Sequence, residues 1–314
     1  MSVSFGEKFT GYIMREDKTC ATVKDGTIVN AESFAPLQIS ERGSFTEWLQ
    51  DRSADLDRSY MRTILKHLNL PVLDRANAVK SVHAASITDN FWIKPQDSNL
   101  THDDVTFKND LYHMAALIGD PDLFSKERIH SPEITNLGSY NKGWKLVDGE
   151  WYMYKAGTPL EIWAEIFTSL LAKRLGLNAV EYKCVDGFSV CKNFVETFNC
   201  FESAKSLVGS DTSYETNIAV MQKYNLVPQY LDILFMDAIV RNGDRHEFNY
   251  GFVTGGHGIK LAPNFDNNMA MFWNGIPTIL ERKDALVFDF VAVLSNCNYT
   301  VYIRMKLNLR GVLK

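Results

Sequence analysis

Residues 243–249 read Gly-Asp-Arg-His-Glu-Phe-Asn, and residues 264–267 read Asn-Phe-Asp-Asn. Asp244 and Asn249 stand in an Asp-x₄-Asn spacing, and Asp266 follows after two short predicted strands. A carboxylate at Asp244 can orient or accept a hydroxyl proton, and the oxygens of Asn249 and Asp266 suit Mg²⁺, which prefers oxygen ligands. Either stretch alone is common in turns, but their order predicts a catalytic loop followed by a metal-binding loop.

The bulk composition is that of a folded protein with a sizeable core. The 314 residues, 46% of them hydrophobic, predict two lobes or domains, or three small units. The net charge of −5 gives no support for the basic face that nucleic-acid binding needs, and no run of Lys and Arg marks one, so we expect no direct contact with nucleic acid. Five cysteines without a Cys-x-x-Cys pair argue against a disulfide framework or zinc site and predict buried, reduced thiols in a cytoplasmic protein. No membrane is expected as a partner, because residues 1–10 resemble no signal peptide and no apolar run reaches about 18 residues.

The secondary-structure pattern changes twice along the chain. Residues 1–125 are mixed, residues 126–195 are mainly strands with one helix over about 160–175, and residues 196–314 are mainly helical. The pattern predicts an α+β, bilobal protein-kinase-like fold with a β-rich small lobe, a helical large lobe and an N-terminal mixed α/β extension. The hinge between the lobes is expected near residues 191–195.

Phosphoryl transfer needs positioning and charge neutralisation more than covalent help from the protein. A kinase site combines a glycine turn over the phosphates, a strand lysine paired with a helix glutamate, a catalytic Asp with an Asn close behind, and a second Asp for metal. In this pattern Asp244 would orient the substrate hydroxyl. Asn249 and Asp266 would bind Mg²⁺, and Asp266 would bridge the metal to the β- and γ-phosphates of ATP.

Lys155 ends a predicted strand, and Glu165 lies in the helix that follows. A pair between these side chains would hold the lysine against the α- and β-phosphates. Glu161 is the rival partner, one turn earlier on the same helix face, and Glu165 is preferred because it lies mid-helix. An exposed surface pair is the plainer alternative for any Lys and Glu.

Further nucleotide contacts are expected from a glycine turn and from the hinge. Residues 138–143 read Gly-Ser-Tyr-Asn-Lys-Gly, a turn whose backbone N–H groups can cradle phosphates although it matches no established phosphate-loop motif. His246 is interpreted as bracing the catalytic loop or Asp266, with a role as metal ligand or base as the alternative. The expected nucleotide contacts are Gly138, Ser139, Lys142, Lys155, Glu165, Lys192, Phe194 and His246.

Residues 241–252 read Arg-Asn-Gly-Asp-Arg-His-Glu-Phe-Asn-Tyr-Gly-Phe and residues 261–266 read Leu-Ala-Pro-Asn-Phe-Asp. These strings resemble the HipA-like serine/threonine kinases of bacterial toxin–antitoxin systems. The resemblance implies phosphorylation of an unidentified protein substrate with ATP and two Mg²⁺ ions, and an antitoxin or regulator protein as partner. It also implies autophosphorylation at Ser139, with an ordinary turn serine as the alternative. Unlike eukaryotic kinases, the chain has its Arg-His after the Asp and has neither Asp-Phe-Gly nor Ala-Pro-Glu.

Three other functions fit parts of the pattern. A lipid or small-molecule kinase would use the same ATP site, and Gly-Asp-Arg-His-x-x-Asn also resembles lipid kinases. A nucleotide-binding pseudokinase acting as an interaction module is disfavoured, because the charged positions of the pattern are all present. A metal phosphohydrolase using Asp244, His246 and Asp266 lacks a supporting His-rich metal motif.

Overall fold

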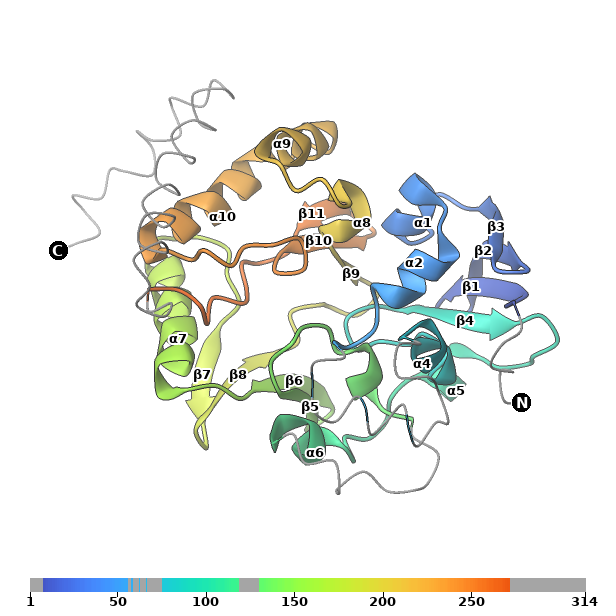
Figure 1. Cartoon of the computed structure of the whole chain (residues 1–314), viewed down its shortest axis with the longest axis horizontal. Coiled ribbons are helices and arrows are strands. Elements are labelled where there is room, and N and C mark those ends of the chain that lie inside the picture. The colour runs from blue at the N-terminus through green and yellow to red at the C-terminus, as the bar shows by residue number, and fades with distance from the viewer. Residues whose placement is uncertain are drawn as a thin grey trace.

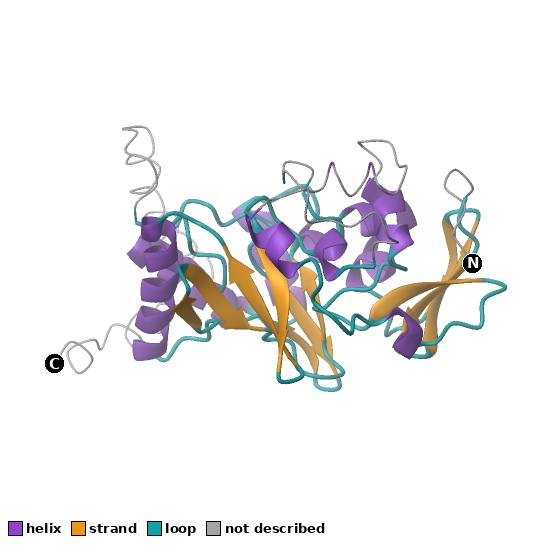
Figure 2. Ribbon diagram, turned by 90° about the horizontal axis from the view of Figure 1, so that it is seen from below, coloured by secondary structure: helices purple, strands orange, loops and turns teal. Residues whose placement is uncertain are grey.

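The computed structural model describes residues 8–55, 58, 62, 66, 75–118 and 130–271. Three antiparallel sheets follow one another through the molecule, with helices packed around them (Figures 1 and 2). The N-terminal sheet lies at one end and helix α7 (Pro159–Arg174) lies at the other. No helix within these ranges has the length and apolar character needed to cross a membrane.

The N-terminal region is built on a four-stranded sheet in the order β3-β2-β1-β4. Its elements are β1 (Gly11–Arg15), β2 (Lys18–Lys24), β3 (Thr27–Ala31), α1 (Leu37–Arg42), α2 (Phe45–Gln50), α4 (Arg75–Ser81), β4 (Phe91–Pro95) and α5 (His102–Val105). Ile13 and Val23 from the sheet share one buried cluster with Trp48 of α2. Ser44 caps α2 by accepting the N–H of Glu47 (3.4 Å), as a serine directly before a helical stretch predicts.

The second sheet has the order β5-β6-β8-β7 and packs against α7. The elements of this region are α6 (His113–Ile118), the 3₁₀ helix η2 (Pro132–Thr135), β5 (Lys142–Val147), β6 (Glu150–Lys155), α7, β7 (Tyr182–Val185) and β8 (Phe188–Lys192). A two-residue Asp-Gly turn with positive φ at both positions closes the β5–β6 hairpin. Helix α7 begins at a capping box between Thr158 and Glu161. The hairpin fixes Lys155 at the end of β6, and the helix places Glu165 on its buried face.

The third sheet has the order β11-β10-β9 and lies beside the helices of the large lobe (Figure 1). The elements are β9 (Cys200–Ser203), α8 (Lys205–Val208), α9 (Tyr214–Lys223), α10 (Val227–Val240), β10 (Gly251–Gly255) and β11 (Gly258–Leu261). Helix α10 is buried on more than one face. Its residue Leu231 packs in a cluster with Phe252 of β10, whereas Met236 packs in another with Ala164 of α7. Helix α10 therefore joins the sheet of the large lobe to the helix that carries Glu165.

Several sequence expectations need correction. The pattern of residues 135–146 also predicts a strand on each side of the glycine turn, but only the second exists, as β5. Thr135 instead ends the 3₁₀ helix η2, which opens with proline and is capped by Ser131, and residues 136–141 form no strand. The region after the hinge was expected to be mainly helical, but it also contains β9, which the pattern missed. Cys184 is exposed, contrary to the expectation of buried thiols. A helix expected near residues 285–294, and Cys297, lie outside the described residues.

Candidate active site

Helix α10 leads directly into the predicted catalytic loop. The buried Asn242 follows the helix, and its side-chain oxygen accepts the backbone N–H of Asp244 (3.2 Å). Asn249 closes the loop from the far end, because its amide donates to the backbone oxygen (2.8 Å) and to the carboxylate (3.3 Å) of Asp244. His246 braces the loop by accepting the N–H of Phe248 at Nδ1 (3.2 Å). The loop therefore presents Asp244 from a backbone fixed at several points.

Arg245 joins the catalytic loop to the metal loop. Its buried guanidinium pairs with Asp237 of α10 through two bonds, Nε to Oδ2 (2.9 Å) and Nη2 to Oδ1 (2.8 Å). It also donates to four oxygens of the two loops: the backbone oxygens of Asn249 and Phe265 and the side-chain oxygens of Asn264 and Asn267. Sequence reasoning treated Arg245 only as a departure from the eukaryotic pattern. A local hint was Asp237, one of two carboxylates in a mostly apolar helix.

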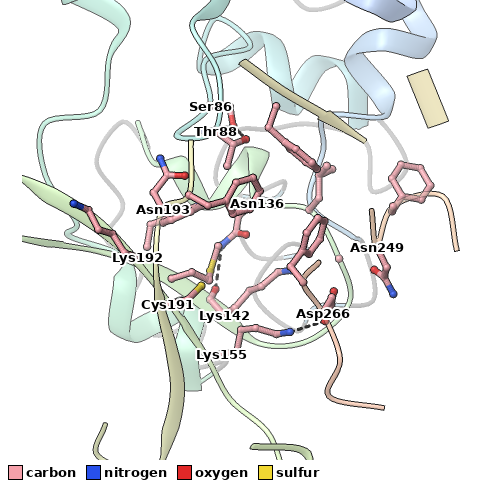
Figure 3. Close-up of a pocket in the computed structure, with 18 of the residues that line it drawn as sticks. Ser86, Thr88, Asn136, Lys142, Lys155, Cys191, Lys192, Asn193, Asn249 and Asp266 are labelled. Carbon is pink, nitrogen blue, oxygen red and sulfur yellow. Dashed lines mark hydrogen bonds and ion pairs between the residues drawn. The ribbon is translucent and has the colours of Figure 1, made fainter. Parts of the chain in front are cut away.

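The ammonium of Lys155 lies between the carboxylates of Glu165 (2.9 Å) and Asp266 (2.5 Å). Figure 3 shows the bond from Lys155 to Asp266 at the edge of the cavity. Glu165, and not Glu161, is therefore the partner on α7, and its second oxygen accepts the backbone N–H of Asn267 (3.0 Å). Burial alone would lower the pKa of Lys155, but the two carboxylates outweigh burial and raise the pKa. The ammonium consequently stays charged at any physiological pH.

The pKa values of the two carboxylates that border the cleft, Asp266 and Asp244, are shifted in opposite directions. Burial would raise the pKa of Asp266, but Lys155 and Lys142 outweigh burial and hold that pKa well below its usual range. Burial raises the pKa of Asp244; the charge of His246 opposes this rise, and the charge of Asp266 adds to it. Opposite shifts in one cleft suit a division of roles, with Asp266 as a fixed anion and Asp244 closer to accepting a proton.

The glycine turn lies over the same cleft. Gly138 has φ of +99°, which side chains rarely adopt, and Lys142 Nζ lies 2.7 Å from where a Cβ on Gly138 would stand. Ser139 is exposed and borders a cavity of about 810 Å³ that Asp244 also borders. Burial and the charge of Arg58 lower the pKa of Lys142 to about 7. Within the described ranges the ammonium of Lys142 makes no hydrogen bond or ion pair, so it is available to an anion.

A second cavity lies beside the charged groups (Figure 3). Its apolar wall consists of Leu137, Trp144, Met153, Phe194, Phe201 and Phe265. Phe194 is stacked with Phe265, with ring centroids 5.7 Å apart. Lys192 also borders the cavity, but its ammonium points away and pairs with Glu150 (3.1 Å). The hinge therefore offers the aromatic ring of Phe194 to a base, but not the charge of Lys192.

Both predicted Mg²⁺ ligands, Asn249 and Asp266, line the same two cavities. The amide nitrogen of Asn249 is occupied by Asp244, and in the part of the chain that the structure describes its Oδ1 accepts no hydrogen bond. Asp266 supplies an ionised carboxylate beside it on the wall of the same cavities. Two such oxygens fit a hard cation that takes its remaining ligands from phosphate and water. No group of three or more His, Cys, Asp and Glu side chains placed to share an ion was found over the described residues.

Comparisons with known proteins show what this architecture is similar to. No family model matches the chain, and no curated protein matches its sequence. The Helicobacter pylori proinflammatory kinase CtkA matches with a TM-score of 0.39 and 21% identity over 54% of this chain, which spans only 63% of the CtkA chain. The Shewanella oneidensis MR-1 toxin–antitoxin complex of HipA, HipB and operator DNA matches with a TM-score of 0.54 and 12% identity over 82% of this chain and 76% of the matched chain. The predicted α+β, bilobal, kinase-like fold is thereby confirmed, because the chain shares the fold of the chain matched in the HipA–HipB complex.

Proposed function

We propose that the chain is an ATP- and Mg²⁺-dependent serine/threonine protein kinase. The observation that carries the proposal is the convergence of Lys155, Glu165, Asp266, Asp244 and Asn249, from separate elements, on one cleft. A buried lysine between two carboxylates adds little stability over a well-packed apolar cluster, so its position at a cleft favours a functional role. The HipA-type fold supports the proposal at the level of architecture.

The position of each side chain supports one part of the transfer. Lys155, oriented by Glu165, would bind the α- and β-phosphates, and the oxygens of Asn249 and Asp266 would hold Mg²⁺. When bound, Mg²⁺ neutralises charge on the phosphate oxygens. Asp244 would orient the substrate hydroxyl and accept its proton at a carboxylate oxygen as the hydroxyl oxygen bonds to the γ-phosphorus of ATP. The bond between that phosphorus and the β,γ-bridging oxygen would break at the same time, and ADP would leave. The raised pKa of Asp244 makes the carboxylate a better proton acceptor than an ordinary aspartate.

The apolar cavity and the glycine turn supply the rest of the nucleotide site in this proposal. The stacked rings of Phe194 and Phe265 form a wall against which an adenine ring can pack. Lys142 adds an unpaired ammonium next to Gly138, where the phosphates would lie under the turn. A phosphate on Ser139 would occupy this space and would switch the enzyme off by charge and bulk.

Partners and location belong to the same proposal. The HipA neighbour was solved with HipB and operator DNA, and by analogy we propose an antitoxin or regulator protein as partner of this chain. The presence of DNA in that complex gives no support to the expectation that the chain avoids nucleic acid. We propose a cytoplasmic location, where ATP and protein substrates are available.

The test is transfer of labelled phosphate from Mg²⁺-ATP to the proteins of a cell lysate, followed by identification of the labelled residue. We expect phosphoserine or phosphothreonine with the wild-type protein and none with Asp244→Asn, which should still bind Mg²⁺-ATP. Label on lipid or small molecules would favour the other kinase class, and binding without transfer would favour a pseudokinase. Equal transfer by wild type and Asp244→Asn would remove Asp244 from its role.

A further inference from the structure

Tyr140, the third residue of the glycine turn, connects the turn to two other elements of the cleft. Its hydroxyl donates to Glu161 Oε1 on α7 (2.8 Å) and lies 3.0 Å from the sulfur of Met269, three residues after Asp266. Tyr140 is half-buried and borders the cavity that Asp244 also borders. One side chain therefore links the turn, the helix of the Lys–Glu pair and the segment that follows the metal loop.

The Glu161 side chain is also held by contacts other than the hydrogen bond from Tyr140. Its second oxygen, Oε2, accepts the backbone N–H of Thr158 (2.6 Å), and its own N–H donates to the Thr158 hydroxyl (3.3 Å), which completes the capping box of α7. Gly157 leaves room for this carboxylate, because a Cβ there would stand 3.2 Å from Oε2. The acceptor is thus preorganised at the start of α7, one turn before Glu165.

Protonation also favours this bond. Burial and the adjacent Glu161 carboxylate raise the pKa of Tyr140, so the phenol remains a donor. Burial would raise the pKa of Glu161, but the hydrogen bonds from Thr158 and Tyr140 outweigh burial and lower it. A neutral donor facing an ionised acceptor is the stronger class of hydrogen bond.

The other end of the turn is anchored from the N-terminal region. Arg58 is 1% exposed, and its guanidinium donates to the backbone oxygens of Gly138 (Nε, 2.7 Å) and Leu137 (Nη2, 2.9 Å). The turn is therefore held at its start by Arg58 and at its middle by Tyr140. Between these two points lies Ser139, which has no such anchor in the described part of the chain.

We propose that the Tyr140–Glu161 pair is a latch that keeps the glycine turn closed over the nucleotide and ties that closure to α7. The inference rests on the proposed function, since it assigns a regulatory contact to the same site. Release of Tyr140 lets the turn lift while Arg58 keeps its first residues in place, so nucleotide enters and leaves on the side of Ser139. Glu161, the rejected partner of Lys155, thereby has a role of its own, and Tyr140 is a positioning residue.

The test removes the latch hydroxyl with Tyr140→Phe and compares it with Tyr152→Phe. Tyr152, on β6, is also half-buried but borders neither cavity. In an Asp244→Asn background, where transfer cannot interfere, calorimetry should show Mg²⁺-ATP binding weakened about 3- to 10-fold by Tyr140→Phe and unchanged by Tyr152→Phe. In the nucleotide-free protein, hydrogen exchange of the amides of residues 138–141 should accelerate in the first variant only.

Kinetics separates a latch from a general loss of stability. With casein as acceptor, Tyr140→Phe should raise the KM for ATP about as much as it weakens binding, with the KM for casein unchanged. A cycle with Glu161→Gln should show that the two changes are not additive. If Tyr140→Phe leaves both ATP affinity and amide exchange as in wild type, the latch is refuted. If wild type binds no ATP, the proposed function fails, whereas amide exchange still decides whether Tyr140 holds the turn.

Discussion

Replacing Arg245 by lysine tests whether one guanidinium holds the catalytic and metal loops together. Arg245 pairs with Asp237 through two bonds, and their side chains are only 8% and 3% exposed. Lysine keeps the charge but cannot span the two oxygens of Asp237 and the loop oxygens together. Removing one partner of a buried pair costs about 3–5 kcal/mol, and the retained charge recovers part of this, so we expect unfolding to become easier by about 3 kcal/mol.

Urea unfolding followed by tryptophan fluorescence measures this change, and titration with Mg²⁺-ATP measures its effect on the site. A loss of about 3 kcal/mol leaves a protein of ordinary stability, about 5–15 kcal/mol, folded without urea, so both experiments apply to one sample. The control is Lys173→Met, which removes a pair with Glu181 (2.6 Å) whose side chains are 66% and 62% exposed. Should Arg245→Lys unfold at the same urea concentration as this control and bind Mg²⁺-ATP equally well, the guanidinium does not join the loops.

Three further changes probe the charged groups of the cleft. Glu165→Gln removes one of the two carboxylates at Lys155 and should lower kcat/KM for ATP about 10-fold or more, equivalent to about 1.4 kcal/mol. An unchanged kcat/KM would show that Glu165 does not position Lys155 for ATP. The pKa of Lys142 is about 7 without nucleotide, so its amine should take up a proton when ATP binds, and ATP affinity should fall as pH rises above 7. Calorimetry in two buffers of different ionisation enthalpy should show this proton uptake. The variant Lys142→Met should abolish it. The same lowered pKa means that burying protonated Lys142 destabilises the folded state below pH 7, and this cost should shrink as pH rises from about 7 towards 10.5, where the unfolded state binds more protons than the folded state. Asp266→Ala should weaken binding of Mg²⁺-ATP more than binding of metal-free ATP, and equal weakening would contradict a metal role.

The elements around the site were predictable because their signals are local. An Asp-Gly turn with positive φ sets the β5–β6 hairpin, and the hairpin sets where Lys155 lies at the end of β6. A capping box between Thr158 and Glu161 sets the start of α7, which brings Glu165 within 2.9 Å of Lys155. The four-residue apolar repeat of this helix does not mark its buried face, since Leu170 is 60% exposed whereas Glu165 and Thr168 are buried. The positions of the catalytic and metal loops were predictable for the same reason, since each loop directly follows a helix or strand whose end the sequence marks.

The contacts that assemble the site depend on distant pairings and were not predictable from local pattern. Arg245 reaches Asp237 and the metal loop only because α10 and the two loops fold back on one another. Lys192 was expected at the nucleotide, but β8 directs its ammonium towards Glu150 on the surface. No role for Arg58 could be predicted from the sequence, because its partners are backbone oxygens on a turn about 80 positions away. The boundaries of the three regions stay predictions.

The N-terminal region makes direct contacts with the elements of the candidate site. Besides the contact of Arg58 with the glycine turn, the backbone oxygen of Ile87 accepts from the hinge side chain of Asn193 (3.0 Å), and that of Thr88 accepts the N–H of Phe201 on β9 (2.8 Å). Buried clusters also cross the boundary, since Cys200 of β9 packs with the N-terminal sheet. The N-terminal region, which carries no kinase motif, therefore helps to position the glycine turn, the hinge and β9. A protein that binds this region and shifts it would therefore change the nucleotide site without touching any of its charged residues.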